Sequence, residues 1–191
     1  MKRDISLILA ATVPHMGIGK DGALPWRLSR EMKYFRQVTT GGIVIMGRRT
    51  WESIPPKFRP LSNRTNVVLS QNGGIDPSSD KYVAASSLDD ALNKVAGVPG
   101  KVFIIGGAQL YNSALQDPRT TRVLLTEITG DVKCDAHFEE FPWVPKGEPS
   151  KGWERTSFEE LKQYVGPDVE VDETIVEEKG LTYQFTMWKR T

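Results

Sequence analysis

Short runs of apolar, mostly β-branched residues, separated by segments with helical spacing, constrain the fold of this chain most strongly. Each run is free of charge until its ends, as expected of strands that are buried on both faces of a parallel sheet. The runs are residues 5–11, 43–46, 66–70, 102–105 and 123–128. This alternation predicts an α/β fold with a central, mainly parallel sheet flanked by helices.

Three segments between these strands have the spacing of helices. In residues 88–95, apolar side chains recur at i, i+3, i+4 and i+7 behind Ser87, a residue type that caps helices, and Gly97 follows as a stop signal. Residues 108–115 open after two glycines, and residues 29–38 carry a third apolar stripe.

The C-terminal part of the chain has a different pattern. Residues 142–152 form a loop rich in Pro, Lys and Gly, and alternation in residues 153–164 and 181–188 predicts antiparallel strands, with a hairpin turn at residues 177–180. We therefore expect an antiparallel edge on the sheet and, at this length, a single domain over residues 1–191.

The charge is unevenly distributed although the whole chain carries only +1. Residues 1–66 hold 12 Lys and Arg against 4 Asp and Glu, a net +8, which leaves −7 for the rest. A basic first third predicts either a small polyanionic ligand or nucleic acid.

Cysteine and histidine are too scarce for most chemistry that depends on them. Cys134 is the only cysteine, which excludes an intrachain disulfide and favours a reducing compartment. With only His15 and His137 besides, no metal site built on His and Cys is expected. Cys134 lies in a charged stretch, which argues against a nucleophilic role.

The start of the chain resembles a signal peptide, because a basic start precedes the apolar residues 5–13. Asp4, Ser6 and the lack of a small-residue cleavage site argue against that interpretation. No apolar run approaches the roughly 20 residues of a membrane helix. We expect a cytosolic protein without membrane contact.

Gly17, Gly19 and Gly22 match the pattern G-x-G-x-x-G behind a strand. In a dinucleotide-binding fold the third glycine opens a helix that faces the pyrophosphate, whereas here Pro25 keeps Leu24 extended. These glycines therefore predict a mobile loop over a ligand, with a plain surface turn as the alternative.

Two strands run into glycine turns that suit phosphate groups. Residues 43–46 lead into Gly47-Arg48-Arg49-Thr50, and residues 102–105 lead into Gly106-Gly107. Glycine lets backbone N–H groups approach an anion at a helix start. Together the turns predict one ligand with several phosphates, while a solvated charge pair and a packing turn remain the alternatives.

Glu31 lies on the apolar stripe of its predicted helix, in line with Leu28, Phe35 and Val38. Desolvation at such a position raises the pKa of a carboxyl group unless a donor pairs with it. An ion pair is the structural alternative, but the neighbouring cations project from other sides of the helix. The position favours a role in reading a ligand.

Arg59 and Arg64 lie on a loop stiffened by Pro60, just before the strand at residues 66–70. A guanidinium at such a place can clamp a carboxylate with two parallel hydrogen bonds, although a plain surface arginine is the commoner outcome. Arg64, which is closer to the strand, is the better candidate.

Taken together, these pieces resemble the dihydrofolate reductase family, in the order expected for that family and over nearly the whole chain. The motifs that carry the resemblance are Gly17-Ile18-Gly19, Leu24-Pro25-Trp26, Glu31 to Phe35, Val44-Ile45-Met46-Gly47-Arg48-Arg49-Thr50-Trp51, Ser53-Ile54-Pro55, Arg59-Pro60-Leu61, Ile104-Ile105-Gly106-Gly107 and Thr126-Glu127-Ile128.

The resemblance implies that NADPH is the cofactor, with Arg48 and Ser70 at the 2′-phosphate and adenine side. Gln71 stands where vertebrate-like members carry a basic residue, so the preference for NADPH rests more on Arg48 and Arg49. The implied cofactor contacts are Ala10, Ile18, Gly19, Gly22, Leu24, Gly47, Arg48, Arg49, Thr50, Leu69, Ser70, Gln71, Ile105, Gly106, Gly107, Ala108, Gln109, Leu110 and Tyr111.

The resemblance implies that dihydrofolate is the substrate and that antifolates inhibit. Glu31 hydrogen-bonds the pterin, with Thr126 and Trp26 holding it through water, while Arg64 takes the glutamyl α-carboxylate. Hydride moves to the ring carbon of the imine, and water delivers the last proton. The implied substrate contacts are Ile8, Leu9, Ala10, Met32, Phe35, Ser53, Ile54, Pro55, Phe58, Leu61, Arg64, Ile105 and Tyr111.

The length and the loop at residues 142–152 are similar to those of eukaryotic members, fungal ones included. A thymidylate synthase domain does not fit in 191 residues, so we expect a cytoplasmic monomer, with a mitochondrial or nuclear pool left open. Phe58 and Met32 differ from the residue types often found in the family, which affects the contacts to inhibitors and to the substrate tail.

Two other functions compete with this interpretation. A reductase of the same fold that acts on a pyrimidine intermediate of flavin synthesis would not need both Glu31 and Arg64. A nucleic-acid binding module would interleave basic residues with exposed aromatics, whereas the cations here cluster at glycine turns. We therefore expect no nucleic-acid partner.

Overall fold

This computed structural model describes residues 3–191 of the chain. A nine-stranded sheet lies at the centre of the fold. The parallel strands are β1 (Ile5–Thr12), β3 (Ile43–Gly47), β4 (Thr65–Leu69), β5 (Val83–Ala85), β6 (Val102–Ile104) and β7 (Thr120–Thr129). The antiparallel strands are β9 (Trp153–Arg155), β10 (Val176–Glu178) and β11 (Leu181–Arg190). The order is β10-β11-β7-β1-β6-β3-β4-β5, and β9 also pairs with β11.

The five apolar runs of the sequence all form strands of this sheet. β1 is the central strand and pairs in parallel with β6 on one side and β7 on the other. Its side chains are buried on both faces, which explains why the run is continuously apolar rather than alternating. Antiparallel pairing begins where β11 joins β7. The prediction of a mainly parallel sheet with an antiparallel edge is therefore confirmed.

The predicted helices are present, and the predicted cap of one of them is observed. Ser87 accepts a hydrogen bond from the backbone N–H of Asp90 at 3.0 Å at the start of α3. The helical segments are α1 (Ser29–Thr39), α2 (Arg48–Ser53), the short 3₁₀ turn η1 (Pro56–Phe58), α3 (Leu88–Lys94), α4 (Ala108–Leu115) and α5 (Phe158–Val165).

The prediction of antiparallel strands over residues 153–164 is wrong for most of that segment. Only Trp153–Arg155 forms a strand, and α5 follows it. Ser157 caps this helix by accepting from the N–H of Glu160 at 3.2 Å, and two acidic residues occupy its first turn. Those are helix-start signals, and they override the short alternating pattern.

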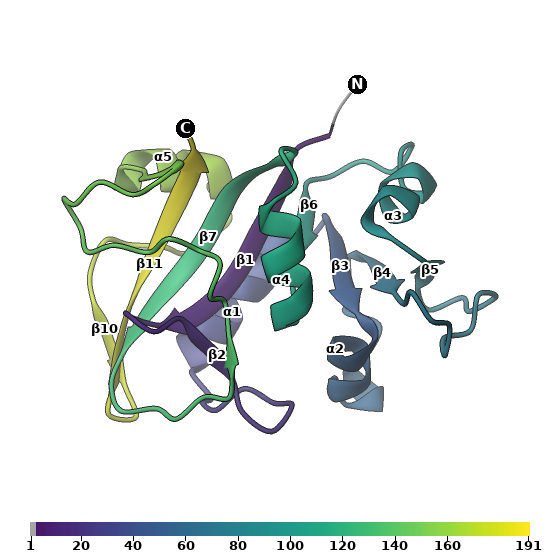
Figure 1. Ribbon diagram of the computed structural model, residues 1–191, viewed down its shortest axis with the longest axis horizontal. Coiled ribbons are helices and arrows are strands. Elements are labelled where there is room, and N and C mark those ends of the chain that lie inside the picture. The colour runs from purple at the N-terminus through teal and green to yellow at the C-terminus, as the bar shows by residue number, and fades with distance from the viewer. Residues whose placement is uncertain (1–2) are drawn as a thin grey trace.

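The sheet separates two apolar clusters, and different helices cover each face. One cluster joins the sheet to α3 and α4, and the other joins it to α1, α2 and α5. In Figure 1, α4 lies in front of β1 and α1 lies behind it. The side chains of neighbouring residues in β1 belong to different clusters, because successive side chains of a strand point to opposite faces.

Parallel strands bring their carboxyl ends to one edge of the sheet. β3 ends at Gly47 and α2 begins directly after it, while β6 ends at Ile104 and α4 begins after the turn at residues 105–107. This is the lower edge in Figure 1, where α2, the small strand β2 (Gly17–Gly19) and the loop after β2 lie. β2 pairs with β8 (Ala136–His137). Among the described residues, no helix is long and apolar enough to cross a membrane.

The predicted hairpin turn at residues 177–180 is also confirmed. β10 ends at Glu178 and pairs in antiparallel fashion with β11, which begins at Leu181. Lys179 and Gly180 between them both have positive φ, 52° and 78°, as a two-residue hairpin turn requires.

Candidate active site

The two predicted phosphate turns lie side by side. The backbone N–H of Gly47 donates to the carbonyl of Gly106 at 2.8 Å, because β3 and β6 are neighbours in the sheet. Gly106 has φ +121°, and a Cβ there would lie 3.4 Å from the Tyr111 ring and 3.6 Å from the Thr50 hydroxyl. Those distances are ordinary van der Waals contacts, so the backbone conformation rather than space calls for glycine here.

The helices that leave these turns have no side-chain caps. Gly47 and Gly107 occupy the N-cap positions of α2 and α4, and neither helix has an acidic residue in its first turn. The first N–H groups of α4 thus face the edge without a side-chain partner, as an anion-binding helix start requires.

Two arginines stand in the first turn of α2, where the helix dipole disfavours cations. Arg48 donates through Nε to Glu52 at 2.8 Å and remains about half exposed. Its guanidinium lies against Gly74, in the loop after β4 where the Ser70 hydroxyl donates to the carbonyl of Gly73. A bound anion would attract both arginines and so offset their unfavourable interaction with the helix dipole.

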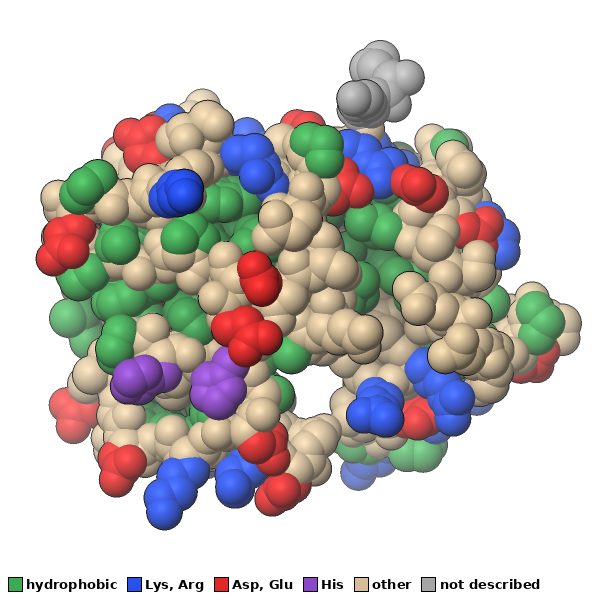
Figure 2. All heavy atoms as spheres, viewed as in Figure 1, with side chains coloured by type: hydrophobic (Ala, Val, Ile, Leu, Met, Phe, Trp, Pro, Cys, Tyr) green, Lys and Arg blue, Asp and Glu red, His purple; other side chains and the backbone are tan. Residues whose placement is uncertain are grey.

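Figure 2 shows an opening at this edge, between the part that carries β2 and the part that carries α2, with basic side chains beside it on the α2 side. Glu31 belongs to the same edge through its contact with β7. The hydroxyl of Thr126, near the carboxyl end of β7, donates to Glu31 Oε1 at 2.8 Å.

Glu31 has no cation partner within the described part of the chain. Its neighbours Arg30 and Lys33 are engaged elsewhere, each at 2.8 Å, with Asp172 and Glu170 respectively. Burial raises the pKa of the Glu31 carboxyl to about 7, and the hydrogen bond from Thr126 opposes that rise. An unpaired carboxyl group with a pKa near neutrality suits a role in proton-coupled chemistry.

The raised pKa makes Glu31 costly for the fold at high pH. Its pKa is about 7 when folded against 4.5 as the ordinary value, so the unfolded chain loses this proton first and stability falls as the pH rises from 4.5 to 7. We expect Glu31→Gln to gain stability relative to the wild type by about 2 to 3 kcal/mol between pH 5 and pH 8. Urea unfolding of both proteins at the two pH values measures this, and a constant difference would contradict it.

The predicted substrate wall is mostly assembled on the α1 face of the sheet. Trp26 and Leu28 are buried there, at 9% and 1% exposure. Met32 and Phe58 are 50% and 59% exposed, which leaves two large apolar side chains open to a ligand. The predicted wall residues of this cluster are Ile8, Ala10, Phe35, Ile54, Leu61 and Ile105.

Two predicted contact residues lie elsewhere. The side chain of Leu9 packs in the cluster on the opposite face of the sheet, so only its backbone can face this wall. Tyr111 is buried, and its hydroxyl donates to the carbonyl of Ile8 at 2.7 Å, which ties α4 to β1.

The structure separates the roles of the two loop arginines. Arg59 donates to the carbonyls of Trp51 and Ile54, both at 3.0 Å, so it holds the chain around α2. Arg64 donates through Nε to the carbonyl of Ser62 and through one Nη to the Thr39 hydroxyl. Its other Nη makes no hydrogen bond within residues 3–191 and is left for a ligand.

Burial, together with nearby Arg36, lowers the pKa of Arg64. A carboxylate partner would relieve both effects. Thr39, at the end of α1, was not predicted as a site residue. Nothing in the local sequence marks it, because its contact to Arg64 spans 25 residues.

The glycine-rich loop is no dinucleotide-binding turn, as the sequence predicted. No helix begins directly at Gly22, since α1 starts only at Ser29, and Lys20 and Ala23 instead form an isolated bridge. A Cβ on Gly17 would lie 2.6 Å from the Cys134 sulfur, so this glycine is needed for close packing. The loop ends at the buried Trp26.

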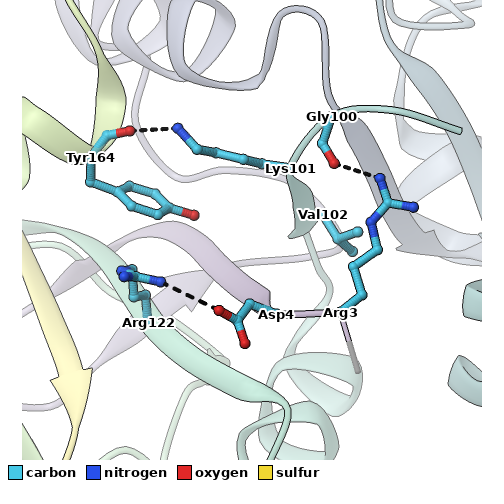
Figure 3. Close-up of a pocket in the computed structure, with 7 residues that line it drawn as sticks. All are labelled: Arg3, Asp4, Gly100, Lys101, Val102, Arg122 and Tyr164. Carbon is cyan, nitrogen blue, oxygen red and sulfur yellow. Dashed lines mark hydrogen bonds and ion pairs between the residues drawn. The ribbon is translucent and has the colours of Figure 1, made fainter. Parts of the chain in front are cut away.

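A cavity of about 290 Å³ lies away from these residues, at the amino ends of the parallel strands. Figure 3 shows Lys101 and Arg122 on either side of the Tyr164 ring, with Arg3 held by the carbonyl of Gly100. None of the predicted site residues lines this cavity. Glu31, Thr126 and the two glycine turns instead lie at the opposite edge.

Comparison with known proteins agrees with this geometry. Residues 4–163 match the family model described as dihydrofolate reductase. The chain is 41% identical to dihydrofolate reductase of Cryptococcus neoformans var. neoformans serotype D, over 96% of this chain and 93% of that one. It is 38% identical to the Candida albicans protein of the same name, over 99% and 98%. The solved Schistosoma mansoni dihydrofolate reductase superposes with a TM-score of 0.77 at 30% identity, covering 100% of both chains.

Proposed function

Because the chain belongs to the dihydrofolate reductase family, it reduces dihydrofolate to tetrahydrofolate, and we propose that it does so at the edge holding Glu31 and the two glycine turns, with Arg64 at the other end of α1. One observation carries this assignment. The carboxyl group of Glu31 is desolvated, has no cation partner among residues 3–191 and is fixed by Thr126, at the edge where the glycine turns open.

NADPH, on which the family depends, fits the residues at the glycine turns. The adjacent turns at Gly47 and Gly106 offer backbone N–H groups for a pyrophosphate, and the guanidinium of Arg48, with Ser70 on the neighbouring loop, offers donors for a further phosphate. When bound, NADPH supplies a hydride. The remaining proposed cofactor contacts are Ala10, Ile18, Gly19, Gly22, Leu24, Arg49, Thr50, Leu69, Gln71, Ile105, Gly107, Ala108, Gln109, Leu110 and Tyr111.

Arg48 should distinguish NADPH from NADH. We expect Arg48→Leu to raise the Kd of NADPH by about tenfold, since a charge-assisted hydrogen bond contributes about 1.5–3 kcal/mol, and to leave the Kd of NADH within about twofold. Fluorescence titration of both cofactors measures this, with the exposed Lys146→Leu as the control. Equal losses for the two cofactors would remove the phosphate-reading role from Arg48.

The assignment of the substrate rests on Glu31, on Arg64 and on the apolar wall of the α1 face between them. Glu31 would accept the N–H donors of the pterin, while Trp26 and Thr126 hold it in place, and Arg64 would bind the tail carboxylate with its free Nη. The apolar wall between them suits the flat ring. We assign Ile8, Ala10, Met32, Phe35, Ser53, Ile54, Pro55, Phe58, Leu61 and Ile105 to substrate contact, Leu9 to contact through its backbone alone, and antifolates to the same wall.

Within this site the chain positions groups and excludes water rather than forming a bond to the substrate. Glu31 orients and polarises the pterin, and the nitrogen next to the reduced carbon gains its proton from water. The loop over residues 17–28 covers the reacting atoms. No part of this reaction calls for a nucleophile or a metal ion.

The direct test is the loss of NADPH absorbance on adding dihydrofolate to the purified chain. We expect turnover with this substrate and none with a pyrimidine intermediate of flavin synthesis. Tight, salt-sensitive binding of RNA or DNA without any absorbance loss would contradict the assignment.

We further propose a cytoplasmic monomer with no nucleic-acid partner. The lone Cys134 suits a reducing compartment. The sheet ends in β5 and β10, strands of three residues each, and short edge strands discourage pairing between chains.

A further inference from the structure

Helix α1, which carries Glu31, has no cap in its own sequence. Leu28 occupies the N-cap position and makes no side-chain hydrogen bond to the helix. Ser29 is the first helical residue, so its backbone N–H is one of the groups that a helix start leaves unpaired.

The cap comes from the C-terminal hairpin instead. Glu178, at the end of β10, accepts through Oε2 from the backbone N–H of Ser29 at 2.8 Å and from the Ser29 hydroxyl at 2.9 Å. Its other oxygen accepts from the hydroxyl of Tyr183 at 2.9 Å. The carboxylate is thus fixed on two sides, and it places a negative charge at the positive end of the α1 dipole.

The acidic segment that leads into this hairpin, residues 170–178, makes further contacts with α1. Asp172 pairs with Arg30 and Glu170 pairs with Lys33, each at 2.8 Å, and the backbone N–H of Glu170 donates to Gln37 at 2.9 Å. These ion pairs are exposed, and each contributes little alone. They show, however, that the acidic C-terminal segment is matched to the basic helix, which accounts for part of the charge asymmetry along the sequence.

We propose that Glu178 is a positioning residue of the folate site, whose carboxylate closes the N-terminus of α1 and thereby sets where that helix presents Glu31. The proposal rests on the proposed role of Glu31. Glu31 is two residues beyond Ser29, so a shift of the first turn moves its carboxyl group relative to Thr126, which belongs to the sheet. Glu178 is not among the residues proposed above to contact substrate or cofactor, and its carboxylate accepts from Ser29 and Tyr183.

The test compares two lost helix caps. We expect Glu178→Ala to raise the KM for dihydrofolate by about five- to twentyfold while the Kd of NADPH stays within about twofold, since small misplacements at a binding site are costly. Ser87→Ala removes the observed cap of α3, far from α1 in the chain. It should lower Tm by a similar amount and leave the KM unchanged.

Two further variants separate positioning from general damage. Glu178→Gln keeps an oxygen for Ser29 and should restore most of the KM, whereas the exposed neighbour Glu177→Ala should behave as wild type. Ser29→Ala should raise the KM less than Glu178→Ala, and the double variant should be no worse than Glu178→Ala alone. If Glu178→Ala folds poorly, Glu178→Gln and Ser29→Ala still decide the question.

The proposal is overturned if Glu178→Ala lowers Tm as Ser87→Ala does but leaves the KM for dihydrofolate within twofold of wild type. That outcome leaves the proposed function intact. Failure of the proposed function would be recognised separately, as unimpaired turnover by Glu31→Gln.

Discussion

Replacing Glu31 with Gln should reduce kcat for dihydrofolate at neutral pH by about a hundredfold or more, the scale of a lost acid–base or polarising group. The amide preserves the shape of the side chain and can still accept from Thr126, so the fold and the cofactor site should be preserved. The Kd of NADPH should therefore stay within about twofold. The exposed Glu139→Gln is the matched control.

The pH profile provides a second readout of the same variant. Burial raises the pKa of Glu31 to about 7, and the reduction consumes a proton, so wild-type kcat/KM should fall as the pH rises through about 7. This inflection should be absent in Glu31→Gln. Unimpaired turnover at neutral pH, or an unchanged inflection, would remove Glu31 from the chemistry.

Replacing Arg64 with Leu should raise the KM for dihydrofolate by about 10- to 150-fold and change kcat much less. The reason is the loss of a charge-assisted carboxylate contact, about 1.5–3 kcal/mol, made equally before and during the reaction. A folate analogue without the glutamyl carboxylates should lose almost nothing further on this substitution. That comparison isolates the contact, because the variant and the analogue remove the same interaction.

Arg59→Leu supplies the contrast to Arg64. Its guanidinium is occupied by backbone carbonyls around α2, so this substitution should lower Tm rather than discriminate between dihydrofolate and the shortened analogue. If Arg59→Leu raises the KM for dihydrofolate but not for the shortened analogue, and Arg64→Leu shows no such difference, the two assignments must be exchanged.

Most of the predicted strands and helices follow from the spacing of apolar residues that are close in the sequence. The buried strands, the cap of α3 and the apolar stripe that holds Glu31 all depend on residues within one or two turns or strand repeats of each other. The single misjudged element, α5, had a local signal as well, because Ser157 and the acidic residues after it mark a helix start. The short alternating pattern over residues 153–164 is a weaker signal than this helix start.

The pairing of distant groups depended on topology. The sequence placed glycines after two strands, but only the adjacency of β3 and β6 brings Gly47 against Gly106. Arg59 and Arg64 look alike in the sequence, and only the path of the chain binds Arg59 to carbonyls around α2 while leaving one Nη of Arg64 without a hydrogen bond among residues 3–191.

The sequence by itself therefore determined the α/β class, the buried central strands, helices α1, α3 and α4 and the placement of a carboxyl group on an apolar helix stripe, because each follows from the spacing of neighbouring residues. Only the tertiary structure decided what that carboxyl group meets. Thr126 is 95 residues away, and the Glu178 that caps its helix is 149 residues from Ser29. Strand order and register set such contacts, and no local pattern encodes them.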